Sequence, residues 1–474
     1  MKKQFSSLVA GLSCTLVMMM ATPVMGQRFS EEMINQGRYL ATASDCIACH
    51  TSDKRKPMAG GHAIDSPVGR IVATNITPSR TFGIGNYTEQ QFADAVRLGV
   101  RADGARLYPA MPYTAFSYIT DEDIHALYAY FMEGVKPVDE PTEPTELPFP
   151  MNIRASMIGW NFLFANTRPF EPDAAESELW NRGRYLSVGP GHCATCHTPR
   201  GFTMQEKTGK ALQGAHVGAW FAPDITSSSV NGIGSWSVEE LMTYLATGRL
   251  EGKAQAAGPM AEAVTHSFSR LREDDLRAIS TYILSVPPSD PIPSVTENRF
   301  DHGGPGDLLV DFRGTSYEDG MRLPGLGRGA QIYSANCASC HGYEGQGTRD
   351  AYYPSLFGKS ITGGTSTANL IAVILNGVER ETPQGGHVFM PPFGDQDNAM
   401  VPLDNDEIAA LSNYIFTFYG NPGLSVTPAE VQVIRDGGPK SDIVLIARIG
   451  LAAGVLVVLG LGVWLFRRRR ANWG

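Results

Sequence analysis

Six of the seven cysteines in the 474-residue chain fall into three copies of one pattern, in which a histidine directly follows the second of two cysteines. The copies are Cys46-Ile47-Ala48-Cys49-His50, Cys193-Ala194-Thr195-Cys196-His197 and Cys337-Ala338-Ser339-Cys340-His341. Residues three apart on a helix lie on the same face, about one turn from each other. Two sulfurs at this spacing can form thioethers with the two vinyl groups of a haem, and the adjacent imidazole can reach the iron.

The repetition argues against the other common uses of cysteine. An even number of cysteines in an exported protein usually forms disulfides, but such pairing gives no reason for a histidine after every second cysteine. A zinc site made of two cysteines and one histidine would lack its fourth ligand in all three copies. The pattern therefore predicts three covalently bound haem c groups, with His50, His197 and His341 as iron ligands.

The surroundings of the motifs repeat as well. The motif histidines are 147 and 144 residues apart, which is close to the length of one domain. Each motif is preceded by a helical segment with a glycine and an aromatic residue, and followed by an amphipathic helix that starts near an acidic run. We expect the two helices to cross, the glycine allowing a close approach and a tyrosine of the later helix packing in the core. The glycines are Gly37, Gly183 and Gly329, and the tyrosines are Tyr130, Tyr282 and Tyr414.

A methionine beside a proline lies at a similar place in each repeat, on what we expect to be a rigid loop before the last helix. These residues are Met111, Met260 and Met390. A methionine thioether as sixth ligand would close the iron to small molecules and raise its potential, which suits electron transfer. Packing in the core is the alternative role for a methionine, and His266, His387 and Met400 are rival ligands.

The sequences at both ends of the chain indicate that the protein is directed to a membrane. Residues 1–26 combine two lysines near the start, an apolar stretch and small residues before the expected cleavage site, which predicts a secretory signal peptide. A lipoprotein signal at Cys14 is the alternative, but too little apolar sequence precedes that residue. Residues 449–466 are uncharged and mostly apolar, so they can span the hydrocarbon core once. Four arginines follow at 467–470, which places this end in the cytoplasm and the rest of the mature chain in the periplasm.

Charge excludes one class of partner. The chain has 39 basic and 48 acidic residues, a net charge of −9, and several of the basic residues belong to the two terminal segments. The body between them is therefore more acidic than the whole chain. An acidic body repels phosphate backbones, so we expect no nucleic-acid partner.

At this point the chain resembles a known family, the three-haem cytochrome c subunits of membrane-bound periplasmic dehydrogenases of acetic-acid-type bacteria. The resemblance covers nearly all of residues 30–430, and the segments that carry it are 45–50, 73–78, 108–113 and 191–201. In that family the subunit takes electrons from a separate catalytic subunit and passes them to ubiquinone in the membrane. The resemblance thus implies an electron-transfer subunit with no substrate chemistry of its own.

The resemblance also bears on the partner. Segments 149–154 and 159–161 are similar to those of cytochromes that accompany molybdopterin aldehyde dehydrogenases, which implies a molybdopterin catalytic subunit with an iron–sulfur subunit. The C-terminal span resembles the fructose type, so fructose and alcohol dehydrogenases are the alternatives. A self-sufficient multihaem enzyme would need an open iron position, and a methionine in every repeat argues against it. A tethered carrier that docks with a soluble redox protein would differ only in its partner.

We therefore expect a mainly α fold of three tandem class I cytochrome c domains and one C-terminal transmembrane helix. The predicted parts are a signal peptide at 1–26, domain 1 at 27–136, a linker and strap at 137–175, domain 2 at 176–286, a linker at 287–321, domain 3 at 322–422, a transmembrane helix at 443–466 and a cytoplasmic tail at 467–474.

Overall fold

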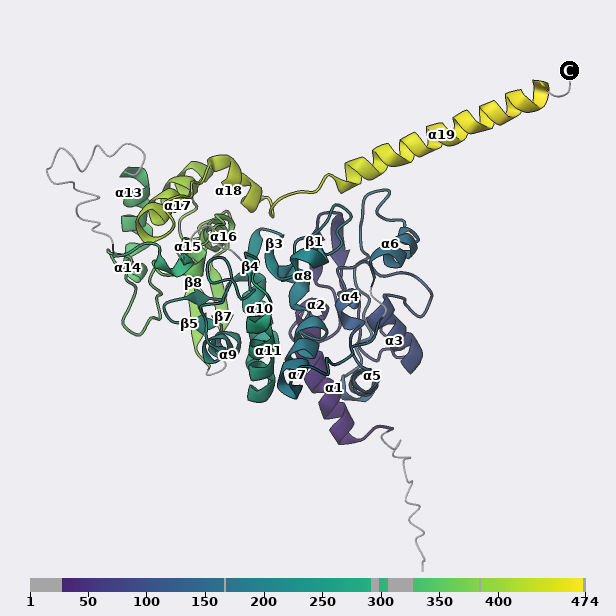
Figure 1. Cartoon of the computed structure of the whole chain (residues 1–474), viewed down its shortest axis with the longest axis horizontal. Helices are drawn as coiled ribbons and strands as arrows, with labels where there is room; N and C mark the ends of the chain where they lie inside the picture. The colour runs from purple at the N-terminus through teal and green to yellow at the C-terminus, as the bar shows by residue number, and fades with distance from the viewer. Residues whose placement is uncertain (1–27, 166–167, 291–297, 306–326, 383–384, 472–474) are drawn as a thin grey trace, which may run out of the picture.

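Most of the regular structure is helical, and it forms three successive groups of elements that each carry one of the motifs (Figure 1). The computed structural model describes residues 28–165, 168–290, 298–305, 327–382 and 385–471. The predicted signal peptide lies outside the described residues, and so does most of the predicted linker at 287–321.

The first group begins and ends with helices whose N-termini are capped by side chains. Ser30 accepts a hydrogen bond from the Met33 amide at the start of the first helix, and Thr120 accepts one from the Asp123 amide before the last. Such caps satisfy amide groups that the helix itself leaves unpaired. The elements are α1 (Glu31–Ala43), α2 (Cys46–His50), β1 (Ala63–Ser66), β2 (Gly69–Val72), α3 (Glu89–Leu98), α4 (Tyr113–Phe116), α5 (Asp121–Ala129) and a π-helical turn, η1 (Tyr130–Gly134).

The second group repeats this order with two additional short strands. Ser237 and Glu240 form a capping box at the start of its central helix, and Gly248 ends that helix in the left-handed conformation. The elements are α7 (Glu178–Val188), α8 (Cys193–His197), η2 (Thr208–Lys210), β3 (Gln213–Val217), β4 (Trp220–Asp224), α9 (Val238–Thr247), β5 (Arg249–Leu250), β6 (Ala254–Gln255), α10 (Gly258–His266), η3 (Phe268–Arg270) and α11 (Glu273–Ser285).

The third group ends in a long helix that begins with a capping box between Asp404 and Glu407. Its elements are η4 (Arg299–Asp301), α13 (Gly327–Asn336), α14 (Ala338–His341), α15 (Ser360–Gly363), α16 (Ala368–Asn376), β7 (Val378–Glu381), β8 (His387–Met390), α17 (Asn405–Tyr419) and α18 (Pro428–Arg435).

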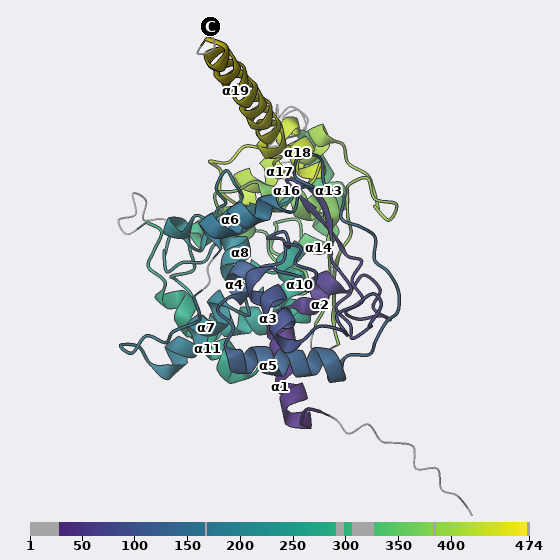
Figure 2. The same ribbon diagram turned by 90° about the vertical axis from the view of Figure 1, so that its right-hand side faces the viewer.

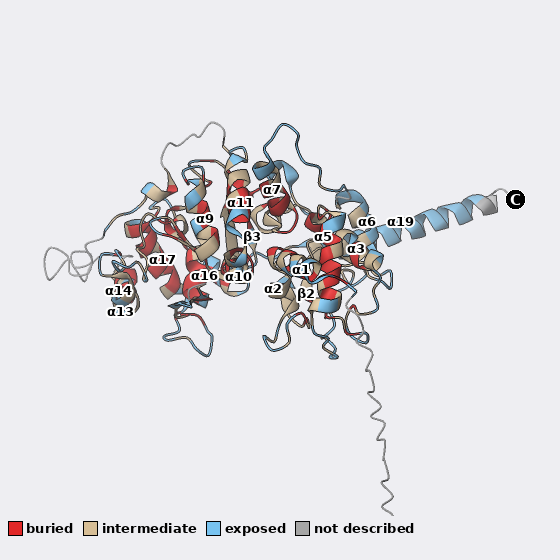
Figure 3. Cartoon of the chain, turned by 90° about the horizontal axis from the view of Figure 1, so that it is seen from below, coloured by how far each residue is buried: buried red, intermediate tan, exposed pale blue. Residues whose placement is uncertain are grey.

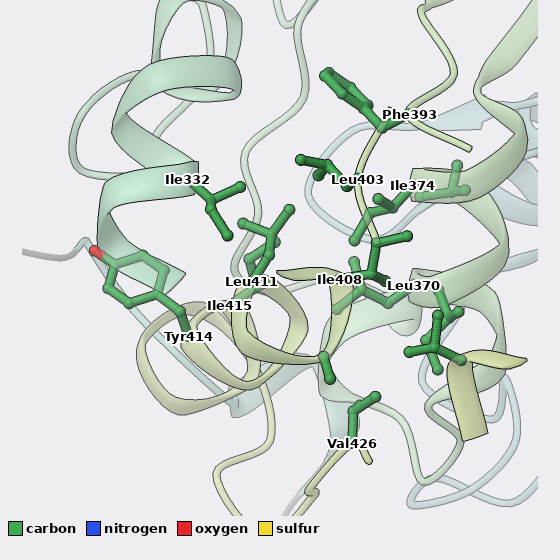
Figure 4. Close-up of a cluster of buried hydrophobic side chains, with 14 of the residues drawn as sticks. Ile332, Leu370, Ile374, Phe393, Leu403, Ile408, Leu411, Tyr414, Ile415 and Val426 are labelled. Atoms are coloured by element: carbon green, nitrogen blue, oxygen red, sulfur yellow. The ribbon is translucent and has the colours of Figure 1, made fainter. Parts of the chain in front are cut away.

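Each group has its own cluster of buried apolar side chains. The third cluster, drawn in Figure 4, joins Ile332 of α13, Leu370 of α16 and Ile408 of α17. Trp220 and Phe221 of β4 also pack against it, so the second and third groups are in contact. The strands form two-stranded antiparallel sheets: β1–β2, β3–β4, β5–β6 and β7–β8. The mainly α class is confirmed, whereas the division into three tandem domains with the stated boundaries stays a prediction, which the three clusters support.

The predicted helix crossing occurs in all three groups. A Cβ atom at Gly37 of α1 or at Gly183 of α7 would lie 1.9 Å from a backbone carbonyl oxygen of the later helix, and one at Gly329 of α13 would lie 2.3 Å from such an oxygen. Only a residue without a side chain fits at these positions. The tyrosines fulfil their expected role to different degrees, because Tyr414 is fully buried whereas Tyr130 and Tyr282 are partly buried against their clusters.

Two helices stand apart from the three groups. α6 (Ser156–Phe164) lies within the predicted strap, and α19 (Ile443–Ala471) extends from the body with most of its described side chains exposed (Figures 1 and 3). Within the described residues, Ile443–Arg468 is one helix that is long and apolar enough to cross a membrane. This agrees with the predicted C-terminal span.

Candidate haem-attachment sites

Each motif forms a short helix directly after the first long helix of its group: α2, α8 and α14. The six motif cysteines form no disulfide within the described part of the chain, so they are available for thioether bonds. Burial raises the pKa of Cys46, Cys193 and Cys337, the first cysteine of each motif, to about 12. These thiols are therefore neutral and lie toward the apolar interior.

The three motif histidines make the same hydrogen bond. Nδ1 of His50 donates to the carbonyl oxygen of Thr74 at 2.7 Å, His197 donates to Pro223 at 2.7 Å, and His341 donates to Pro354 at 2.9 Å. Burial lowers the pKa of all three rings, so they are neutral. A neutral ring that donates through Nδ1 keeps the lone pair of Nε2 for a metal, and the carbonyl fixes the orientation of the ring.

Each candidate methionine packs on the same cluster as the first cysteine of its own motif. Met111 and Cys46 contact the first cluster, Met260 and Cys193 the second, and Met390 and Cys337 the third. Their predicted placement on loops holds only for Met111. Met260 lies in α10 and Met390 ends β8, because a proline fits the first turn of a helix and the position after a strand as well as it fits a loop.

The rival ligands occupy less favourable positions. Met400 is 71% exposed, and His387 is an exposed residue whose Nε2 lies 3.5 Å from a carboxylate oxygen of Glu379. His266 is the last residue of α10 and is partly buried. Within the described residues, no group of three or more His, Cys, Asp or Glu side chains is arranged to hold a metal ion.

Buried donors without a partner also fit a haem. The indole N–H of Trp236 and two guanidinium nitrogens of Arg380, Nε and Nη2, are buried and make no hydrogen bond within the described part of the chain. Both residues lie beside Tyr244 of α9. The ring of Trp236 contacts the ring of Tyr244, and the charged side chain of Arg380 is near enough to interact with Tyr244 electrostatically. An anionic group with several acceptor oxygens, such as a haem carboxylate, satisfies donors of this kind.

The first two groups are joined by a pair of equivalent contacts. The hydroxyl of Tyr39 in α1 donates to Asp275 in α11, and the hydroxyl of Tyr185 in α7 donates to Asp123 in α5, each at 2.5 Å. The tyrosines both stand two residues after a helix-crossing glycine, and the aspartates both lie in the first turn of the later helix. Reciprocal contacts of this kind are typical of a two-fold interface. The third group has Gln331 at the tyrosine position.

This interface brings the first two motifs close to each other. Burial raises the pKa of the Cys49 thiol, and the nearby charges of Asp45, Glu262 and Cys196 add to this, so that the pKa is about 11. In addition, α10 of the second group packs against α2. The first and second attachment sites are therefore neighbours, a relation that the sequence alone did not reveal.

Three functional residues escaped the sequence analysis, namely the carbonyl partners of the histidines. A signal for two of them was present, since residues 73–77 (Ala-Thr-Asn-Ile-Thr) and 222–226 (Ala-Pro-Asp-Ile-Thr) are similar and carry Thr74 and Pro223 at the same place. Pro354 follows no such pattern, because the third repeat has a different sequence after its motif.

Comparisons with known proteins bear on the whole chain. Residues 325–415 match the protein family described as cytochrome c oxidase, cbb3-type, subunit III. The fructose dehydrogenase cytochrome subunit of Gluconobacter japonicus is 44% identical over 460 residues, which cover 95% of this chain and 93% of that protein.

Two further relatives extend over most of the chain. The cytochrome c subunit of the quinone-type alcohol dehydrogenase of Gluconobacter oxydans (strain 621H) is 38% identical, covering 87% of this chain and 84% of the relative. The gluconate 2-dehydrogenase cytochrome c subunit of Pantoea cypripedii is 35% identical, covering 86% and 90%. An aldehyde dehydrogenase subunit is not among these relatives, so the aldehyde partner stays a prediction.

Proposed function

Because the chain belongs to the family of cytochrome c subunits of fructose, alcohol and gluconate dehydrogenases, we propose that it carries electrons from a catalytic dehydrogenase subunit to ubiquinone. The observation that carries this proposal is the threefold repetition of one arrangement, a pair of cysteines outside any disulfide and a partly buried histidine whose Nδ1 donates to a carbonyl. Three equivalent sites in one chain suit the transfer of electrons over a distance that one site could not cover.

Each residue of the arrangement has one role. The cysteine pairs 46/49, 193/196 and 337/340 attach three haem c groups through thioethers. His50, His197 and His341 would hold the iron through Nε2, and Met111, Met260 and Met390 would be the further iron ligands. When bound, haem c supplies one-electron redox chemistry. With both a histidine and a methionine assigned to hold each iron, the chain itself would oxidise no substrate.

The same proposal gives the chain an orientation. α19 spans the inner membrane once, Arg467 to Arg470 remain in the cytoplasm, and the acidic body with its three domains lies on the periplasmic side. The relatives are named as subunits of dehydrogenases, which favours this role over that of a self-sufficient multihaem enzyme.

Two substrates are candidates for the partner. The segments at 149–154 and 159–161 favour an aldehyde dehydrogenase with molybdopterin and iron–sulfur subunits. The relative that covers 95% of the chain is a fructose dehydrogenase subunit, which favours fructose as the second candidate.

The test is purification of the intact complex from native membranes, followed by mass analysis of its subunits and cofactors. The complex should reduce a ubiquinone analogue with an aldehyde as the donor, and this chain alone should oxidise no aldehyde, alcohol or sugar. Fructose as the only active donor, with a flavin in the partner, would replace the aldehyde assignment. Substrate turnover by the isolated chain would refute the electron-transfer role.

A further inference from the structure

α6 is an apolar helix with an apolar face in solvent. Its nine residues contain no charged side chain, and Ile158, Phe162 and Leu163 are 55%, 88% and 67% exposed. Phe149 and Ile153, in the segment just before it, are also exposed. Single exposed apolar residues are ordinary in soluble proteins, but a contiguous apolar patch marks a surface that contacts something.

The other face of α6 is fastened to the body, so the apolar face is held outward. The indole N–H of Trp160 donates to the carbonyl of Thr203 at 2.8 Å, and the hydroxyl of Tyr113 donates to the side-chain oxygen of Asn161, also at 2.8 Å. Trp160 and Tyr113 are also in edge contact. Because these contacts use positions 160 and 161, the helix cannot rotate to bury Phe162.

The patch lies on the side of the body that carries the predicted membrane helix. The guanidinium Nε of Arg448 in α19 donates to the carbonyl of Phe149 at 2.9 Å. Both side views place α6 at the end of the body from which α19 departs (Figures 1 and 2). A membrane crossed by α19 would therefore have its surface next to α6.

We propose that α6 lies in the interface of the membrane that α19 spans, with Ile158, Phe162 and Leu163 among the acyl chains. The proposal rests on the proposed membrane anchoring and adds a second contact to it. Interfacial helices bury an apolar face at the headgroup boundary while their other face stays polar, and here the body of the protein takes the place of the polar face. One span alone would let the body turn about α19, whereas two contacts fix the side that it presents to the bilayer.

The side of the body that would face the bilayer carries the first attachment site. Met111 lies between two tyrosines that hold the strap: the hydroxyl of Tyr108 donates to the carbonyl of Met151 at 2.9 Å, and Tyr113 binds Asn161. A bilayer in contact with α6 therefore lies nearest to the methionine side of the first site. Within the proposed function, this makes the first site the one that faces the ubiquinone in the membrane.

The experiment uses the full-length haem-loaded chain in vesicles of phosphatidylethanolamine and phosphatidylglycerol that contain a phospholipid with a photoactivatable group on its acyl chain. After illumination, mass analysis should find label within residues 156–164 as well as within 443–468. The double variant Phe162→Ser/Leu163→Ser should lose the label on α6 but keep both the label on α19 and the haem absorbance. The control Phe82→Ser changes a 43%-exposed phenylalanine outside the patch. It should keep the label on both helices and the haem absorbance.

The other outcomes separate the proposal from the function on which it rests. Label on α19 with none on α6 would overturn the interfacial contact and leave the anchor in place. Absence of label from both helices would overturn the anchor and the contact together. If the intact dehydrogenase complex gives cross-links from α6 to its catalytic subunit and no lipid label there, α6 is a protein-docking surface and the proposal is wrong.

Discussion

Replacing Asp275 with asparagine should weaken the contact between the first two groups of the fold. Asp275 is 4% exposed, and its carboxylate accepts hydrogen bonds from Tyr39 of the first group and from Arg182 and Arg272 of its own group. Burial alone would raise the pKa of this carboxyl, but the hydrogen bonds from Arg182 and Tyr39 outweigh burial and lower the pKa from 3.8 to about 2. The folded state therefore favours the charged form.

The size of the effect follows from this pKa. A fall from 3.8 to about 2 corresponds to roughly 2 kcal/mol of stabilisation at neutral pH. Because the folded-state pKa lies below the unfolded value, the contribution is complete above about pH 4 and is lost as the pH falls toward 2. The loss in Asp275→Asn should thus be about 2 kcal/mol at pH 7 and about half of that at pH 3.

Urea unfolding of the full chain, followed by tryptophan fluorescence and by haem absorbance, measures this loss. The control is Asp274→Asn, which removes the same charge from the neighbouring, exposed position of α11. If the two variants have the same unfolding midpoint at pH 7, or if the deficit of Asp275→Asn does not shrink in acid, then this carboxylate does not hold the two groups together.

Three further predictions test other parts of the account. Gly183→Ala places a methyl group 1.9 Å from a carbonyl oxygen of α11, so it should lower the free energy of unfolding by at least the ~1–3 kcal/mol typical of overpacking and lower the melting temperature. The control is Gly209→Ala, because a Cβ atom there has nothing within 4 Å. Equal melting curves for the two variants would contradict the predicted crossing. Met390→Ala should lower the potential of the third haem and allow it to bind carbon monoxide, as followed by redox titration and absorbance; no change in either would assign the ligand to a rival residue. Truncation before Ser441 should weaken membrane retention in fractionation while preserving the haem spectrum, and full retention would mean that α6 or a partner suffices.

The sequence was sufficient for features that depend on short separations along the chain. The motif spacing predicts the attachment helices, and the recurrence of Gly37, Gly183 and Gly329 predicts the helix crossings, because each glycine belongs to a pattern that appears three times. The same reasoning was less accurate for the methionines. A proline next to Met260 or Met390 indicates a break in regular structure, but it does not tell a loop from the start of a helix or the end of a strand.

Contacts between the groups lay beyond sequence reasoning. Tyr39 and Asp275 are 236 positions apart, and nothing in either helix indicates which surface of another group it meets. The one available signal was that tyrosine follows the crossing glycine by two residues in the first two repeats and glutamine does so in the third. Similarly, the apolar composition of residues 156–164 fits a buried strap as well as an exposed helix, and the choice depends on how Trp160 and Asn161 are held by residues far along the chain.

The most direct test of the account is the amount of haem iron per polypeptide in the purified full-length protein, combined with mass mapping of the attached peptides. We predict three iron atoms per chain, with haem covalently linked at the cysteine pairs 46/49, 193/196 and 337/340. Two or fewer, or an unmodified cysteine pair in the mature protein, would contradict the assignment of three equivalent electron-carrying sites.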